Sequence, residues 1–225
     1  RKKLDPREFA SLYQQTPYIV GGNLIKSGWW KYYDPKDVEY QSIIIAADTA
    51  FKKTEQSDYS VLMVMGADKN ADLYIIDIVR NKWDFPELKR ACIQLNTKWR
   101  GRGLRGFYIE DKASGQSLIQ ELKNQSGLAV IPYKVSVDKV SRVAAITDLI
   151  EGGRVFLKKT ANWLDDFLEE SVGFPNGSHD DQIDALTIAL KSLNLKKGSE
   201  VIIPAMTLGV LYSRLSTRAL SNLAA

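Results

Sequence analysis

Several carboxylates stand at positions in this sequence where they could act together in one reaction. They follow short apolar runs that predict buried strands, or they open the last stretch with helical spacing. These residues are Asp48, Glu110, Asp111, Asp180, Asp181 and Asp184. Strand ends and helix starts can converge on one crevice of an α/β sheet, so we expect several of these side chains to share a site. On a helix, Asp184 can share a face with Asp180 or with Asp181.

A divalent metal ion is the simplest explanation for such a gathering of negative charge. Two carboxylates about 4 Å apart repel each other by roughly 4 kcal/mol at an effective dielectric near 20, and a helix N-terminus offsets only about 0.3 to 1 kcal/mol of this. Oxygen ligands suit Mg²⁺ or Mn²⁺, and two such ions about 4 Å apart can activate water and stabilise the leaving oxygen of a phosphodiester. The expected metal ligands are Asp48, Glu110, Asp180, Asp181 and Asp184, and the first four are the expected catalytic residues.

An alternative without chemistry stays open for each of these acids. Asp48 and Glu110 could be buried turn carboxylates, and Asp180 could cap the last helix. Asp111 suits a helix cap or a group that holds a ligand in place. His179 suits a hydrogen-bonding turn residue, and it could also orient a carboxylate or a phosphate.

Three polar residues near the first predicted strand could border the site. Asp58 stands at the start of the second strand, where it could reach the site or form a turn. Lys52 and Lys53 follow Asp48 in a loop, where they could contact a DNA phosphate or stay solvated.

The composition excludes several classes of protein. The chain has 225 residues, a formal net charge of +4 and a pI near 9.0. With Cys92 as its one cysteine and His179 as its one histidine, it can form no internal disulfide and no cysteine-rich zinc site. It contains no apolar stretch of about 18 residues and no GxxxxGK[ST] phosphate loop, so we expect neither a membrane span nor ATPase activity in this chain.

Hydrophobic periodicity predicts a mixed α/β fold. The first three strands, at 42–47, 59–66 and 73–79, are expected to form an antiparallel meander. Further strands are expected at 106–109, 129–131 and 154–157, and helices at 84–99, 114–124, 138–150, 162–170 and 180–193. The chain order is therefore β-β-β-α-β-α-β up to Pro132, which is expected to end the seventh element, and helices are expected on both faces of the sheet.

The chain divides into three segments by composition. Residues 1–41 mix charges and aromatic residues without a sustained period, which favours an arm or linker. Residues 42–197 hold the predicted α/β domain. Residues 198–225 contain several leucines and only one acidic residue, Glu200, which suits a partner-binding helix or a frayed tail.

Several motifs, taken in this order, resemble one known family. They are the run Ile-Ile-Ile-Ala-Ala-Asp-Thr-Ala ending at Ala50, Tyr-Ile-Glu-Asp-Lys-Ala-Ser-Gly at 108–115, and His-Asp-Asp-Gln-Ile-Asp-Ala-Leu at 179–186. Lesser matches lie at 13–17, 21–22, 25–30, 58–61, Lys139, Arg142 and 151–155. Over roughly residues 8–194 the chain resembles the C-terminal nuclease domain of large terminase subunits from tailed bacteriophages and prophages.

This resemblance implies a ribonuclease H-like fold and a metal-dependent endodeoxyribonuclease that cuts concatemeric double-stranded DNA during genome packaging. It carries the family's catalytic acids over to Asp48, Glu110 and the pair Asp180–Asp181, with Asp184 as a further candidate, and it adds Lys139 and Arg142 as residues near the ligands or the DNA. It also implies an ATPase domain before the arm in the full-length form, a small terminase subunit and a portal protein as partners, and the cytoplasm of the bacterial host as the location.

Two other functions remain open from sequence. The chain could be another ribonuclease H-like nuclease of the resolvase or transposase type. It could also be a DNA-binding or assembly module without catalysis.

Overall fold

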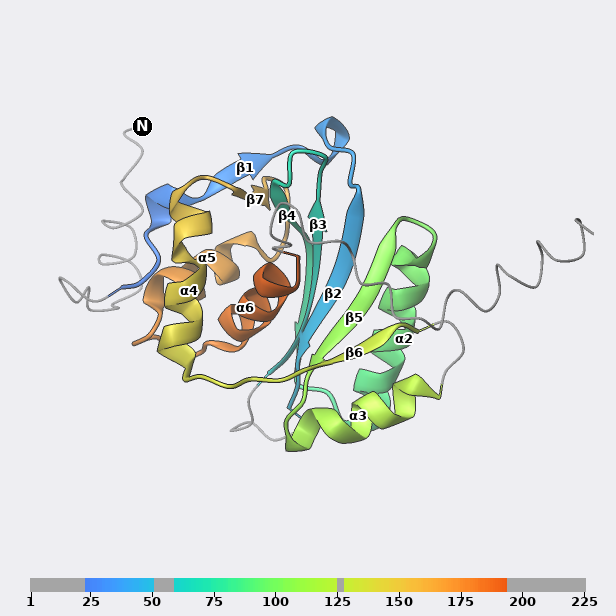
Figure 1. Cartoon of the computed structure of the whole chain (residues 1–225). Coiled ribbons are helices and arrows are strands. Elements are labelled where there is room, and N and C mark those ends of the chain that lie inside the picture. Colours follow the sequence, from blue (N-terminus) through green and yellow to red (C-terminus); the bar gives the residue numbers. More distant parts are fainter. Residues whose placement is uncertain (1–22, 51–58, 125–127, 194–225) are drawn as a thin grey trace, which may run out of the picture. The chain divides into compact units, whose positions relative to one another are not determined.

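The computed structural model describes residues 23–50, 59–124 and 128–193, which form a seven-stranded mixed sheet covered by helices on both faces (Figure 1). The strand order is β1-β7-β4-β3-β2-β5-β6. The strands are β1 (Lys31–Tyr33), β2 (Ser42–Asp48), β3 (Ser60–Ala67), β4 (Leu73–Asn81), β5 (Leu104–Glu110), β6 (Val130–Tyr133) and β7 (Val155–Lys158). The helices are α2 (Phe85–Arg100), α3 (Ala113–Lys123), α4 (Lys139–Glu151), α5 (Leu164–Gly173) and α6 (Asp181–Leu193), with two short 3-10 helices at Ser27–Trp29 and Pro35–Asp37.

The central strands form the predicted meander. β3 pairs antiparallel with both β2 and β4, and β5 lies parallel to β2 on the other side. The buried strands are almost continuously apolar because helices cover both of their faces. The mixed sheet with helices on both faces, predicted from the periodicity, is therefore confirmed.

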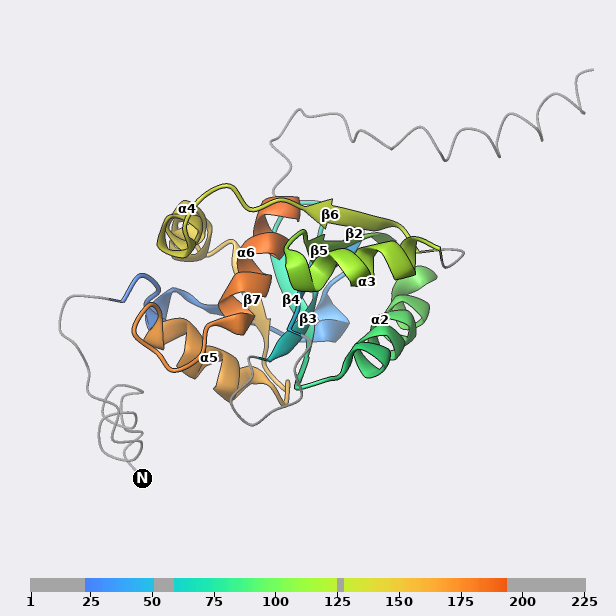
Figure 2. The same cartoon turned by 90° about the horizontal axis from the view of Figure 1, so that it is seen from below.

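The helices divide into two layers with separate cores. Helices α4, α5 and α6 lie on one face of the sheet, and α2 and α3 lie on the other (Figure 2). Nearly every residue of α6 is buried, because this helix packs on β2 and β3 while α4 and α5 cover its outer side. Any group at the start of α6 is thus held in a fixed place relative to the ends of the strands.

Strand β1 is an element that the sequence pattern does not reveal. It pairs in parallel with β7 at the edge of the sheet, and Trp30 beside it packs edge-on against Phe167 of α5, with ring centroids 5.3 Å apart. Residues 23–41, assigned to an arm by composition, thus contribute an edge strand. A strand of three residues is too short to show a period.

Pro132 does not end β6, contrary to expectation. The strand continues to Tyr133, and Pro132 pairs with Ile109. β6 is an edge strand, so a residue without an N–H group is tolerated there.

Two further points complete the fold. Among the described residues, none of the helices combines the length and the apolar character that crossing a membrane requires. Predictions that concern the arm before residue 23, Lys52, Lys53, Asp58 and the tail 198–225 lie outside the described residues.

Candidate functional site

Asp48 and Glu110 end two neighbouring parallel strands. The register pairs Ala47 with Ile109, so the two acids follow directly at the same edge of the sheet. Both side chains are buried, and both lie within reach of one ammonium group: Lys112 Nζ is 2.5 Å from Asp48 Oδ1 and 2.6 Å from Glu110 Oε2. The two carboxylates thus lie within the 10 Å expected of partners in one site.

The chain after β5 is fixed tightly against the strand end. The N–H group of Asp111 donates to the carbonyl of Tyr133 on β6. Gly115, in the first turns of α3, packs so closely that a Cβ there would collide with the carbonyl oxygen of Glu110. Lys112 stands between these two anchors as the N-cap residue of α3, and its side chain makes no cap hydrogen bond. Its long side chain can therefore turn toward the acids.

The start of α6 is capped by a residue from another helix. Glu170 on α5 accepts hydrogen bonds from the backbone N–H of Gln182 at 2.6 Å and from its side-chain amide at 2.7 Å. Asp180, an alternative cap from sequence, instead pairs its carboxylate with Lys139 at 2.7 Å. The capping role, left open for the acids of this segment, thus belongs in part to Glu170.

Asp184 joins the helix to the strand acids through a buried arginine. Arg142 on α4 donates to Asp184 at 2.8 Å and lies 3.5 Å from Glu110. Lys139, also on α4, bridges Asp184 and Asp180 at 2.7 Å each. Lys139 and Arg142 therefore hold the carboxylates in place from one side.

Asp181 faces a different set of partners. Arg80, at the end of β4, lies 3.4 Å from Asp181 and 3.6 Å from Glu170. The Arg80 guanidinium also stacks on the ring of Tyr59 at 3.9 Å. Of the three acids at 180–184, Asp184 is thus the one tied most directly to the Asp48–Glu110 pair.

Burial and ion pairing set the protonation of the strand acids. Burial raises the pKa of Asp48 to about 7, although the neighbouring Lys112 partly opposes this. Burial also acts on Glu110, but Lys112 and a hydrogen bond from Asp48 together lower the pKa of Glu110 below its ordinary value. Of this pair, Asp48 therefore carries the proton near neutral pH when no cation other than Lys112 is present.

The donor set fits a divalent cation, although positive side chains now lie among the carboxylates. Across the described residues, no three acidic, histidine or cysteine side chains are arranged to hold a metal ion by themselves. However, Asp48 and Glu110 already hold one cationic nitrogen between two oxygens. Glu110 Oε2 accepts no hydrogen bond of suitable geometry, which leaves it free to bind a cation. All-oxygen donors of this kind suit Mg²⁺ or Mn²⁺.

The remaining predicted residues lie around this centre. His179 is exposed and packs edge-on against Tyr59, with ring centroids 5.5 Å apart. Asp111 is half-buried, and its backbone holds the strand end as described above.

Sequence reasoning missed three residues of the site. Lys112 stood inside a recognised motif without a role, whereas Arg80 and Glu170 look like ordinary members of a strand and a helix. The one available signal was a charge in a position where the period requires an apolar residue: Glu170 falls on the buried stripe of α5.

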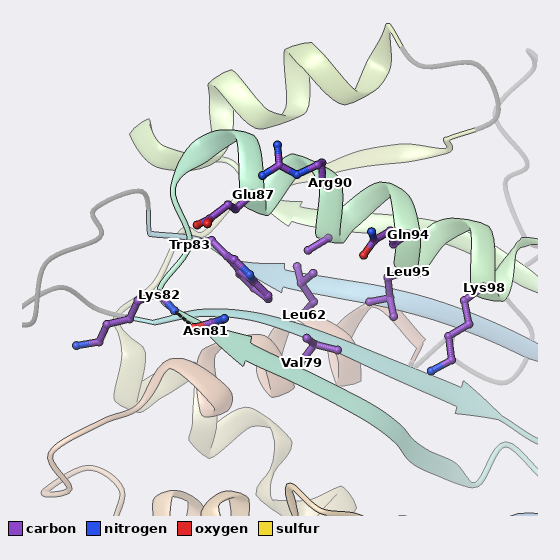
Figure 3. Close-up of a pocket in the computed structure, with 11 residues that line it drawn as sticks. Leu62, Val79, Asn81, Lys82, Trp83, Glu87, Arg90, Gln94, Leu95 and Lys98 are labelled. Carbon is purple, nitrogen blue, oxygen red and sulfur yellow. Dashed lines mark hydrogen bonds between the residues drawn. The ribbon is translucent and has the colours of Figure 1, made fainter.

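A groove of about 530 Å³ lies on the opposite face of the sheet, between α2 and strands β3 and β4 (Figure 3). Leu62, Val79 and Leu95 form part of its lining, and Lys82, Arg90 and Lys98 lie around them. None of the candidate carboxylates borders this groove, so we place the candidate site at the sheet edge instead.

Known structures and one family share this architecture. The model of the terminase RNaseH-like domain family matches residues 45–193. The Thermus phage P74-26 large terminase nuclease domain superposes with a TM-score of 0.58 at 16% identity, covering 80% of this chain and 100% of that one. The large terminase nuclease of thermophilic phage G20c with bound magnesium gives 0.57 at 17% identity, with 77% and 98% covered.

A large terminase from another thermophilic bacteriophage gives a TM-score of 0.56 at 13% identity, and this chain spans 44% of its length. No curated protein matches the chain. At these identities the structural likeness establishes the fold, and the family match establishes the relationship. The chain therefore belongs to the terminase RNaseH-like domain family.

Proposed function

We propose that this chain is a metal-dependent endonuclease that hydrolyses phosphodiester bonds of double-stranded DNA. The observation that carries the proposal is the pair of buried carboxylates, Asp48 and Glu110, which converge on one cationic nitrogen at the ends of adjacent strands. Burying two acids side by side is unfavourable unless a cation compensates them. A purely structural site would gain nothing from this arrangement.

Asp48 and Glu110 would hold the metal, with further oxygen ligands from the start of α6. Asp184 is the best placed of these by its link to Glu110, and Asp180 and Asp181 remain candidates from the family resemblance. When bound, two Mg²⁺ or Mn²⁺ ions would supply an activated water and stabilise the leaving oxygen. Large terminase nuclease structures of phage G20c carry zinc, magnesium and cobalt, which supports a divalent cation here.

The positive side chains of the site would divide two tasks. Arg142 is buried between Glu110 and Asp184, so it orients carboxylates rather than contacting DNA. Lys139 is partly exposed and could also meet a DNA phosphate. Lys52 and Lys53 stay proposed phosphate contacts. Phosphate contacts carry no base information, so cleavage should show little sequence preference.

We further propose that the chain works within a genome-packaging terminase in the bacterial host cell. The same thermophilic bacteriophage terminase, of which this chain spans about half in these two structures, was also solved with ATP-gamma-S and with ADP. An ATPase domain, a small terminase subunit and a portal protein are therefore its proposed partners.

A plasmid-cleavage assay tests the proposed activity. The full chain should convert supercoiled DNA to nicked and linear forms with Mn²⁺ or Mg²⁺, and excess chelator should stop the reaction. Asp48→Asn and Glu110→Gln should lose cleavage, whereas Asp148→Asn, an exposed acid on α4, should cut at the unmutated rate. Cutting by both site variants at the unmutated rate, with folding verified, would refute the nuclease site.

A further inference from the structure

Lys112 occupies the point between Asp48 and Glu110 where a bound cation would neutralise both. Its nitrogen lies 2.5 Å and 2.6 Å from the two carboxylates, which is not far beyond the roughly 2.1 Å at which oxygen ligands approach Mg²⁺. An ammonium group and a metal ion cannot fill the same place. Metal binding therefore requires this side chain to leave.

The surroundings allow the side chain to leave while its backbone stays. The backbone of residues 111–115 is held by the hydrogen bond from Asp111 to Tyr133 and by the packing of Gly115 against Glu110. The Lys112 side chain is 43% exposed, whereas the Asp48 side chain is 7% exposed. A flexible four-carbon stem that borders solvent can swing outward without disturbing the strand ends.

The other cations of the site cannot take the same part as easily. Arg142 is buried, with 7% of its side chain exposed, and it is fixed between two carboxylates. Lys139 bridges Asp180 and Asp184 from α4 and contacts neither strand acid in the structure. Lys112 alone, among the described cations, joins exposure to contact with both strand acids.

We propose that Lys112 is a displaceable counterion of the nuclease site: it neutralises Asp48 and Glu110 while metal is absent and then turns outward to contact the scissile phosphate of DNA. This inference rests on the proposed function. It assigns Lys112 two opposite effects, since it competes with the metal but assists the substrate. A lysine with a purely structural role would support both.

Amine labelling of the full chain tests the displacement directly. A short pulse of an acylating reagent, followed by peptide mass spectrometry, measures the reactivity of each lysine in chelator and in saturating Mn²⁺. We expect Lys112 to become at least about threefold more reactive with Mn²⁺. Lys89, which pairs with Glu121 on the opposite face of the sheet, serves as the matched control and should not change. Unchanged or lower Lys112 reactivity in protein that binds Mn²⁺ overturns the inference alone.

Lys112→Met tests the two opposite effects. Titration calorimetry should show Mn²⁺ binding at least about fivefold tighter than in the unmutated chain, while cleavage at saturating Mn²⁺ should fall at least about tenfold. Lys89→Met should change neither. Weaker Mn²⁺ binding together with slower cleavage would indicate a structural lysine and overturn the inference. If neither the unmutated chain nor Lys112→Met bound Mn²⁺, the proposed function would fail and this inference with it.

Discussion

At the scale of single residues, Asp48 distinguishes a metal ligand from a structural turn carboxylate. Its raised pKa, about 7 because of burial, means that the folded chain binds a proton here more tightly than the unfolded chain does. The stability from this proton is fully present below about pH 4 and is lost as the pH rises through 7.

Asp48→Asn should therefore stabilise the metal-free chain at pH 8 by about 1 to 3 kcal/mol, and this gain should disappear near pH 4. Urea denaturation in chelator at both pH values measures the difference. The same variant should lose cleavage. A loss of stability at pH 8 would instead indicate a structural role for the carboxylate, and Asp148→Asn provides the neutral comparison.

The three acids at the start of α6 should separate by stability as well as by activity. Asp184 is buried and compensates Arg142 and Lys139, so Asp184→Asn should cost about 1 to 3 kcal/mol. Asp180 is 40% exposed, and Asp180→Asn should change stability by less than about 0.5 kcal/mol. The expectation from sequence, that Asp180 or Asp181 matters most for cleavage, stays a prediction. Cleavage by Asp180→Asn at the unmutated rate would exclude Asp180 as a ligand.

At the scale of elements, the junction between β5 and α3 positions Glu110. Gly115 leaves no space for a Cβ beside the Glu110 carbonyl, so Gly115→Ala must push the helix away from the strand end. We expect a loss of about 1 to 3 kcal/mol in unfolding free energy and slower cleavage. Gly101→Ala is the matched control, because a Cβ at Gly101 meets open space. Equal effects of the two substitutions in thermal melts would contradict this account.

The contact between α5 and α6 positions the acids of the last helix. Glu170 caps α6 across the interface and also lies beside Arg80. Glu170→Ala leaves the Gln182 N–H and the Arg80 guanidinium without this partner, so we expect a loss of about 2 to 3 kcal/mol. Cleavage should fall too, because the helix start shifts. Glu169→Ala, an exposed neighbour on the same helix, should have little effect in the same denaturation series.

The elements that sequence predicted well are those with a long period and a buried face. β2, β3, β4 and α2 follow from apolar runs and from a capping box at Asp84 and Glu87. β1 has three residues and no period, and β6 passes through a proline that only an edge position permits. Asp48 and Glu110 could be placed together because strand ends meet at one edge. The pairing of Lys112, Arg80 and Glu170 depends on side chains from distant elements, and no local pattern encodes it.

At the scale of the whole molecule, the charge is distributed unevenly relative to its net value of +4. The candidate site concentrates carboxylates, and the cations next to them, such as Arg142, are already paired. A metal-free site therefore has little positive charge to spare for DNA. A bound divalent cation would change the sign of the local field.

DNA affinity should accordingly depend on both metal and salt. With Ca²⁺, which we use as a divalent cation that does not support cleavage, fluorescence anisotropy of a labelled duplex should show binding at least about tenfold tighter than in chelator. Affinity should fall steeply as salt rises, because each phosphate contact contributes about 0.9 to the slope of log affinity against log salt. The double variant Asp48→Asn with Glu110→Gln should lose the Ca²⁺ effect but keep the salt slope of the remaining basic surface. A flat salt response in the unmutated chain, with Ca²⁺ present, would favour a module that binds protein partners instead of DNA.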